Sequence, residues 1–293
     1  MEPNNKSHKR LFALAAIFLA EGLIFASILI PHPKLENQPA ALILRPSSPE
    51  PELSAHAYLI KLIGQEQPLA KRREWKRLAP ASLTKILTSA AALYGLPPDA
   101  EIKISRQEQQ DLDEKVSGVP DGEVFLRDDA VRLAMVMSAN DAARGIALEV
   151  ERRCICAFAS VMRAWADSLG LADSYFKNPT GLDEEGHYSS AQDLARLAEY
   201  LWLYHPQVWE LSRSVEATVQ SVSGEKYKIQ NTDILLKEYP AISGTKTGFT
   251  DNAKGALLFL YPVRPSYLAV VVLLGSEDRF GDGRKIIEWL ENF

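Results

Sequence analysis

A run of twenty mostly apolar residues, positions 11–30, follows three cations, Lys6, Lys9 and Arg10. Twenty apolar residues in a helix cross roughly 30 Å of hydrocarbon. Glu21 interrupts the run at a cost of about 2.5 kcal/mol, which the surrounding Leu, Ile and Phe residues offset at about 0.5 kcal/mol each. No small-x-small cleavage site follows the run. The pattern therefore favours an uncleaved membrane anchor over a removed signal peptide. In this interpretation residues 1–10 are a cytoplasmic tail and the rest of the chain lies outside the cytoplasm.

Residues 31–52 are rich in proline and show no hydrophobic periodicity. This composition is typical of an extended tether rather than of a folded unit. The remaining residues, 53–293, number about 240, which is enough for one domain with its own hydrophobic core. The sequence therefore predicts a tail (1–10), an anchor (11–30), a linker (31–52) and a single domain large enough to be an enzyme (53–293).

Within this domain the apolar residues have strand spacing at both ends and helical spacing in the middle. Alternation predicts a first strand at 55–63, followed by helices at 82–94, 126–137, 141–151, 158–169 and 190–204. Segments rich in β-branched or aromatic residues then predict strands at 214–222, 226–230, 243–249, 255–262 and 267–275, before a last helix at 283–293. This order favours an α+β fold in which the first and last elements share one antiparallel sheet and a helical cluster is inserted between them.

Composition and charge exclude several classes of protein. The hydrophobic content of 46% suits a globular core, and a net charge of -5 offers no basic surface for nucleic acid. The five histidines show no H-E-x-x-H pattern, so we expect neither a metal ion nor a cofactor, and His187 is interpreted as a surface or hydrogen-bonding residue.

Cys154 and Cys156 would point to different sides of a helix, so we expect buried free thiols rather than a disulfide.

Three short motifs carry the candidate chemistry, and they occur in a fixed order along the chain. They are Ser82-Leu83-Thr84-Lys85, Ser138-Ala139-Asn140 and Lys246-Thr247-Gly248. The first spacing also occurs at Ser174, Ser223 and Ser243, whereas the other two motifs occur once each. The order of the three motifs therefore carries the interpretation, because an active-site serine that reacts with penicillin requires this trio.

The residue types in the first motif suit nucleophilic chemistry. Residues three apart share one face of a helix, so Lys85 can reach the hydroxyl of Ser82. Lysine acts as a base in its neutral form, which burial and a second cation, Lys246, both favour. If Ser82 opens the helix after Pro80, its backbone N–H and the helix dipole face a developing oxyanion.

Each motif also has a simpler interpretation. Ser82 could be a helix cap, since serine is a favoured N-cap residue. Ser138 and Asn140 follow an apolar run and could be ordinary turn residues. Lys246 could point outward from a solvated edge strand. Only the three motifs together favour an active site over these structural roles.

The trio and three longer stretches resemble the D-alanyl-D-alanine carboxypeptidases, which are low-molecular-mass penicillin-binding proteins. The stretches are PASLTK, YFKNPTGLDEEGHYSSAQDLARLAEYL, and NTDILLKEYP leading into ISGTKTGFTDNA. The resemblance covers most of residues 53–293. It implies a β-lactamase-like or DD-peptidase-like fold, with an antiparallel five-stranded sheet, packed helices and an inserted helical cluster.

The resemblance also implies roles for individual residues. The D-Ala-D-Ala carbonyl of a peptidoglycan stem peptide would acylate Ser82, with Lys85 accepting the proton. Ser138 would relay a proton toward the leaving D-alanine. β-Lactam antibiotics would acylate the same serine. The implied function is removal of the terminal D-alanine from stem pentapeptides, with no cofactor, in a membrane-anchored enzyme that faces the cell wall.

The remaining motif residues would bind the substrate. Asn140 would hold the substrate amide, and Lys246 with Thr247 would attract the terminal carboxylate. Gly248 completes the third motif. The backbone N–H of Phe249 would pair with that of Ser82 to form an oxyanion hole, independently of the Phe249 side chain.

Three other functions are compatible with parts of this pattern. A serine β-lactamase would need an E-x-x-L-N pattern between Asn140 and Lys246 and an aspartate in place of Ala139, and both are absent. A DD-endopeptidase or transpeptidase acting on peptidoglycan cross-links would use the same residues, because the difference lies in the acceptor and the shape of the groove. A catalytically weak, membrane-tethered peptidoglycan-binding protein is disfavoured because every reacting residue is present.

Overall fold

The computed structural model describes residues 48–106 and 116–292. The predicted tail (1–10), the predicted anchor (11–30) and most of the predicted linker (31–52) lie outside the described residues. Within the two described stretches, none of the helices combines the length and the apolar character that a membrane crossing needs. Nearly all of the predicted domain, 53–293, is described.

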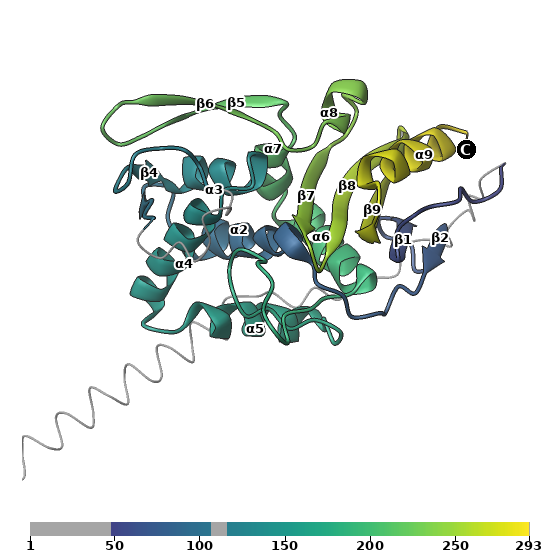
Figure 1. The fold of residues 1–293 in the computed structure, drawn as a ribbon, viewed down its shortest axis with the longest axis horizontal. Coiled ribbons are helices and arrows are strands. Elements are labelled where there is room, and N and C mark those ends of the chain that lie inside the picture. The colour runs from purple at the N-terminus through teal and green to yellow at the C-terminus, as the bar shows by residue number, and fades with distance from the viewer. Residues whose placement is uncertain (1–47, 107–115, 293) are drawn as a thin grey trace, which may run out of the picture. The chain divides into compact units, whose positions relative to one another are not determined.

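A five-stranded antiparallel sheet contains both ends of the domain (Figure 1). Its spatial order is β2 (Ala70–Arg72), β1 (Ala57–Leu62), β9 (Tyr267–Ser276), β8 (Lys254–Arg264) and β7 (Gly244–Thr250). Every neighbouring pair is antiparallel. β1 pairs with β9, so the first and last strands of the domain meet as the order of elements predicted. β7 lies at one edge of the sheet and pairs only with β8.

Helices cover both faces of the sheet, which explains why β8 and β9 are apolar at almost every position. Helix α9 (Arg279–Glu291) packs on one face, where Phe259 and Val271 join Ile286 in one buried cluster. Helix α6 (Ala191–Tyr204) contacts β1 and β9 from the other side. Burying a side chain of this size contributes about 1.5–3 kcal/mol, so these layers stabilise the sheet.

The helical cluster lies beside the sheet and is built around α2 (Thr84–Gly95) (Figure 1). Residues 84–92 of α2 are all buried, because this helix contacts its neighbours on several sides. The neighbours are α3 (Arg127–Val136), α4 (Asn140–Cys154), α5 (Phe158–Leu169) and α7 (Gln207–Ser212). A 3-10 turn, η1 (Ala81–Leu83), precedes α2 and contacts β7 and β8. The turn therefore lies where the cluster meets the sheet.

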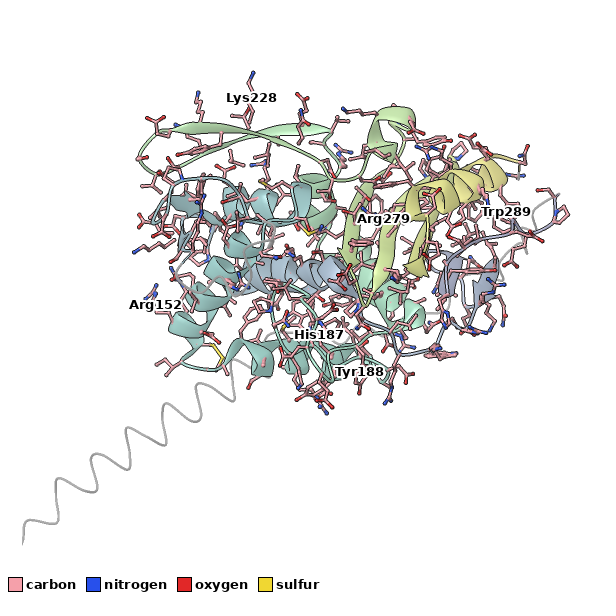
Figure 2. The ribbon with its side chains drawn as sticks, viewed as in Figure 1. Arg152, His187, Tyr188, Lys228, Arg279 and Trp289 are labelled. Carbon is pink, nitrogen blue, oxygen red and sulfur yellow. A yellow bond between two sulfur atoms is a disulfide. The ribbon has the colours of Figure 1, made fainter. Side chains whose placement is uncertain are left out.

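Two of the predicted strands pair with each other instead of joining the main sheet. β5 (Glu216–Gln220) and β6 (Lys226–Gln230) form a hairpin that runs along one side of the helical cluster (Figure 1). Val219 and Ile229 are the only buried residues of its two strands, and Lys228 points outward (Figure 2). A strand pair with one exposed face does not suit a sheet covered on both sides. A second short hairpin joins β3 (Glu101–Lys103) and β4 (Val124–Leu126).

The expectation of free thiols is wrong, because Cys154 and Cys156 form a disulfide. That expectation assumed that both residues lie on a helix. α4 ends at Cys154, however, and Ile155 adopts a left-handed conformation with φ 53°. The chain turns at this residue, and the two Cα atoms lie 5.2 Å apart, within the usual range for a disulfide.

The predicted helices agree with the structure except at their ends. α5 has the predicted bounds, whereas α4 continues to Cys154 and α9 begins four residues early, at Arg279. The predicted helix start at residue 82 is a 3-10 turn, and α2 proper begins at Thr84. The short elements β2, β3, β4, α7 and α8 (Leu235–Glu238) were not predicted, because three to six residues are too few to show a period.

Candidate active site

Ser82 lies in the 3-10 turn between the sheet and the helical cluster, and its side chain is partly exposed. Pro80 precedes the turn, and Ala81 adopts a left-handed φ of 47°. Lys85 follows one turn later, in the first turn of α2, and its Nζ donates to Ser82 Oγ at 2.8 Å. The contact that the three-residue spacing predicted is therefore present, and the serine is still accessible from outside.

Lys85 is fully buried, and its ammonium group also contacts two other segments of the chain. Its Nζ donates to Asn140 Oδ1 at 2.6 Å and to the backbone oxygen of Thr180 at 2.7 Å. An ammonium group has three donors, and these two acceptors with Ser82 Oγ provide three partners. Lys85 thus joins the first motif to the second and to the loop that carries Thr180.

The second motif lies in the sharp turn between α3 and α4. Ser138 has a left-handed φ of 64°, and Asn140 is the first residue of α4. Both side chains are buried. They lie in a turn, as their place after an apolar run indicated, but they are not ordinary turn residues, because Asn140 contacts Lys85 and Ser138 contacts Lys246.

The third motif lies on the edge strand β7. Lys246 Nζ donates to Ser138 Oγ at 2.8 Å and to the Thr247 backbone oxygen at 2.9 Å. Only 1% of Lys246 is exposed, which excludes the simpler interpretation of an outward lysine on a solvated strand. A Cβ at Gly248 would lie 3.0 Å from the Ser82 backbone nitrogen, so β7 passes directly beside the turn that carries Ser82. Phe249 follows, and its side chain is largely exposed.

The structure therefore brings the eight predicted site residues to one junction. They are Ser82, Lys85, Ser138, Asn140, Lys246, Thr247, Gly248 and Phe249. Two hydrogen-bonded clusters, one around each lysine, lie next to each other because residues 138 and 140 belong to the same turn. Among the described residues, no three or more His, Cys, Asp or Glu side chains are arranged to hold a metal ion.

A loop at residues 175–188 packs against the first motif. Asn178 Oδ1 accepts hydrogen bonds from the Thr180 backbone N–H, the Thr180 hydroxyl and the Gly181 N–H, which shapes the loop tightly. Gly181 has φ 83°, and a Cβ there would lie 1.8 Å from the backbone oxygen of Ala81, so only glycine fits. His187 from the same loop is buried, and its Nε2 lies 3.0 Å from Thr84 Oγ1 (Figure 2).

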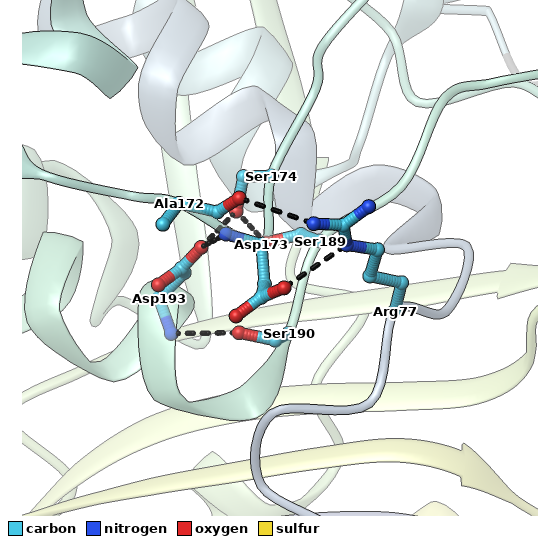
Figure 3. A network of polar contacts seen from close by, with 7 residues as sticks. All are labelled: Arg77, Ala172, Asp173, Ser174, Ser189, Ser190 and Asp193. Atoms are coloured by element: carbon cyan, nitrogen blue, oxygen red, sulfur yellow. Dashed lines mark hydrogen bonds and ion pairs between the residues drawn. The ribbon is translucent and has the colours of Figure 1, made fainter.

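A buried polar network fixes both ends of this loop (Figure 3). Asp193 Oδ2 accepts from the Asp173 backbone N–H and from the Ser174 hydroxyl, each at 2.8 Å. The Ser174 and Ser189 hydroxyls lie 2.8 Å apart, and Ser190 caps α6 by accepting from the Asp193 N–H. Burial raises the pKa of the Asp193 carboxyl. The network holds the loop, and with it the Thr180 oxygen that Lys85 contacts.

Comparison with known proteins decides the family. The family model of the D-alanyl-D-alanine carboxypeptidases, peptidase family S11, matches residues 45–276. The chain belongs to this family. The match includes all three motifs of the site, so the arrangement around Ser82 and the two lysines lies within the part of the chain that defines the carboxypeptidase family.

Individual relatives carry two different activity names. D-alanyl-D-alanine carboxypeptidase DacF of Bacillus subtilis is 31% identical over 243 residues, which are 80% of this chain and 61% of that protein. A D-alanyl-D-alanine endopeptidase of Pseudomonas aeruginosa is 30% identical over 288 residues, which are 96% of this chain and 88% of that protein. The chain therefore spans less than two thirds of the Bacillus carboxypeptidase and most of the Pseudomonas endopeptidase.

Solved structures confirm the fold of the carboxypeptidase family. The ampicillin-bound penicillin-binding protein D2 of Listeria monocytogenes aligns with a TM-score of 0.72 at 26% identity, over 83% of this chain and all of that one. The Streptomyces K15 DD-transpeptidase aligns with a TM-score of 0.76 at 22% identity, over 84% of this chain and all of that one. The predicted fold class, an antiparallel five-stranded sheet with a helical cluster, is confirmed.

Several residues beside the carboxypeptidase motifs were not singled out from the sequence. Asp233 is buried and accepts from the Thr245 hydroxyl, and burial raises the pKa of its carboxyl. Arg279 lies at the start of α9 with its guanidinium 5.8 Å from the centre of the Phe249 ring (Figure 2). Burial lowers the pKa of Arg279, while Asp233 opposes that change. The segment NTDILL, which contributed to the resemblance, was the available signal for Asp233.

Proposed function

We propose that the protein is a serine-type D-Ala-D-Ala carboxypeptidase that removes the terminal D-alanine of peptidoglycan stem pentapeptides through an acyl-enzyme on Ser82. The observation that carries this proposal is the 2.8 Å hydrogen bond between Lys85 Nζ and Ser82 Oγ in a site where Lys246 also contacts Ser138. Nucleophile and base are within reach of each other, and a second proton-bearing pair lies beside them.

In the acylation step Ser82 Oγ attacks the carbonyl carbon between the two D-alanines. The Ser82 proton passes to Lys85, and the oxyanion receives hydrogen bonds from the backbone N–H groups of Ser82 and Phe249. Ser138 relays a proton to the D-alanine nitrogen as the C–N bond breaks, and Lys246, which donates to the Ser138 hydroxyl, replaces that proton. The products are an ester on Ser82 and free D-alanine. Water then hydrolyses the ester, which restores the serine and releases the shortened peptide as a carboxylate.

The substrate-binding roles follow from the same junction. Asn140 begins α4 and accepts a hydrogen bond from Lys85, and its amide can contact the substrate backbone from there. Lys246 and Thr247 offer a buried cation and a hydroxyl for the terminal carboxylate, and Gly248 allows β7 to lie close to Ser82. β-Lactams carry a carboxylate and a reactive amide, so we propose that they acylate Ser82 and remain bound.

A direct test measures D-alanine release from a muramyl pentapeptide together with the mass of the penicillin adduct. We expect D-alanine release and one adduct that maps to Ser82, and we expect Ser82→Ala to abolish both. Lys85→Ala should lower the acylation rate by at least about 100-fold while the protein stays folded, because losing the base affects rate far more than packing. An adduct on Ser174, Ser223 or Ser243, or rapid acylation of the Lys85 variant, would contradict the assignment.

A second candidate function is DD-endopeptidase activity on cross-linked peptidoglycan, since the Pseudomonas relative that matches 96% of this chain carries that name. Carboxylate recognition separates the two. A charge-assisted contact between Lys246 and the terminal carboxylate should lower kcat/KM for a C-terminal amide of the D-Ala-D-Ala peptide by about two orders of magnitude. Equal turnover of acid and amide, together with cleavage of a cross-linked dimer, would favour the endopeptidase.

We further propose that the enzyme is anchored in the cytoplasmic membrane by residues 11–30 and acts on the cell-wall side. Support comes from the cations before the apolar run and from a substrate class that lies outside the cytoplasm. In this arrangement, residues 31–52 tether residues 53–293, which form the catalytic domain.

A further inference from the structure

Thr232 lies in the connection between β6 and α8. It contacts both the segment that leads into the second motif and the strand that carries the third motif. Its backbone N–H donates to the backbone oxygen of Val136 at 3.0 Å, at the end of α3 and two residues before Ser138. Its hydroxyl oxygen lies 2.6 Å from the hydroxyl oxygen of Thr247 on β7. Thr232 therefore links the turn of the second motif to the strand of the third motif.

We propose that Thr232 is a positioning residue that sets the direction of the Thr247 hydroxyl and thereby the preference for a free terminal carboxylate. Thr232 donates its proton to Thr247 Oγ1, which leaves the Thr247 proton for the substrate. The inference rests on the proposed function, in which Lys246 and Thr247 receive that carboxylate.

The number of protons in the pair determines which hydroxyl is the donor. Each hydroxyl has one proton, so only one of the two threonines donates across the 2.6 Å contact. If Thr247 donated to Thr232, its lone pairs would face the carboxylate, and two acceptors would meet in a buried place. If Thr232 donates, Thr247 keeps a proton for the carboxylate, which only accepts. A bound carboxylate therefore selects the arrangement in which Thr232 is the donor.

The residues on either side of Thr232 hold it in place. Asn231 Nδ2 donates to the backbone oxygens of Ser212 at 2.7 Å and Ser214 at 3.0 Å. Asp233 accepts from the Leu235 backbone N–H and from the Thr245 hydroxyl. Thr245 and Thr247 are two residues apart on β7 and so share one face of the strand. The segment is thus fastened to that face at two points, and little rotamer freedom is lost when substrate binds.

The test compares kcat/KM for a peptide ending in D-Ala-D-Ala with that for its C-terminal amide. In Thr232→Ala we expect kcat/KM for the acid to fall about 10-fold, mainly through KM, while the amide changes less than about twofold. Thr232→Ser should restore the preference because it keeps the hydroxyl. Thr232→Val should behave like Thr232→Ala. It keeps the test possible if the alanine variant does not fold. Thr218→Ala, an exposed threonine on β5, is the matched control and should behave as wild type.

Each outcome has a definite meaning. An equal loss on acid and amide would show a purely structural role and overturn the inference, and so would an unchanged preference in both the alanine and valine variants. If the wild-type protein released no D-alanine and formed no penicillin adduct, the proposed function itself would fail, and this inference with it. Activity with an unaltered acid preference in the variants would overturn the role of Thr232 alone.

Discussion

Two residues in the turns of the first and second motifs adopt backbone conformations that residues other than glycine seldom adopt. Ala81, next to Ser82, has φ 47°, and Ser138 has φ 64°. Such conformations cost about 1–3 kcal/mol each and persist only where the surroundings determine them. Here the loop at Gly181 packs against Ala81, and Lys246 hydrogen bonds to Ser138. These two conformations direct Ser82 toward Lys85 and Ser138 toward Lys246.

His187 gives a prediction at the scale of one residue. Burial lowers its pKa from 6.5 to about 4. The unfolded chain binds the proton more readily, so the contribution of neutral His187 to stability is complete above pH 6.5 and is lost as the pH falls toward 4. The loss amounts to about 3 kcal/mol. The free energy of unfolding should therefore decrease more steeply over this range in wild type than in His187→Gln.

The comparison isolates His187, because the buried carboxyls of Asp193 and Asp233, whose pKa values are raised, are present in both proteins. Urea unfolding at pH 4.5, 5.5 and 7 gives the required values. Parallel pH profiles for the two proteins would show that the imidazole titrates normally. D-alanine release between pH 6 and 8 should not depend on His187 ionisation, because the ring stays neutral throughout that range.

At the scale of elements, the site depends on how closely the edge strand β7 approaches the 3-10 turn η1. A Cβ at Gly248 would lie 3.0 Å from both the Ala81 Cβ and the Ser82 nitrogen, closer than ordinary contact. The backbone N–H groups of Ser82 and Phe249, which we propose as the oxyanion hole, belong to these two elements. Their separation is therefore set by the absence of a side chain at Gly248.

Gly248→Ala should slow penicillin acylation of Ser82 at least about 10-fold, because the turn must move by a few tenths of an ångström away from the strand. The stability cost of such overpacking is about 1–3 kcal/mol. Gly95→Ala is the matched control, since nothing lies within 4 Å of a Cβ there and the residue ends helix α2. Stopped-flow acylation and thermal unfolding would distinguish the two variants, and equal acylation rates would show that the close approach is unimportant.

At the scale of the molecule, the site exists only where the sheet and the helical cluster meet. Ser138 and Asn140 come from the cluster, Lys246 from the sheet, and Ser82 from the turn that joins them. The 175–188 loop and the connection at Thr232 each contact more than one of these parts. The reacting groups are thus held by several segments that are far apart in the sequence.

The proposed membrane anchor belongs to the same scale. Because cations precede the apolar run 11–30 and no small-x-small site follows it, we expect protein purified from membranes to retain its N-terminus. N-terminal sequencing together with alkaline extraction of the membranes measures this directly. A mature start beyond about residue 27, with release into the soluble fraction, would indicate a cleaved signal peptide instead.

The sequence by itself determined the family and most long elements, and it predicted eight site residues that the structure brings to one junction. A three-residue spacing on a helix brings Lys85 to Ser82 through local geometry alone, and the apolar runs of β8 and β9 are long enough to show burial on both faces. The prediction that β7 carries Lys246 depended on a short motif with turn and strand signals around it. These features are local, so neighbouring residues specify them.

Only the tertiary structure decided which other residues pack against the predicted site. Four residues contact the site or its strand from distant positions in the chain, and no periodicity encodes such contacts. They are Thr180, Thr232, Asp233 and Arg279. The disulfide between Cys154 and Cys156 depended on one left-handed residue at the end of α4, and the separate β5–β6 hairpin depended on which faces found partners. Close packing between distant segments sets these details, because a backbone oxygen or hydroxyl becomes a partner only where the fold brings it within hydrogen-bond distance.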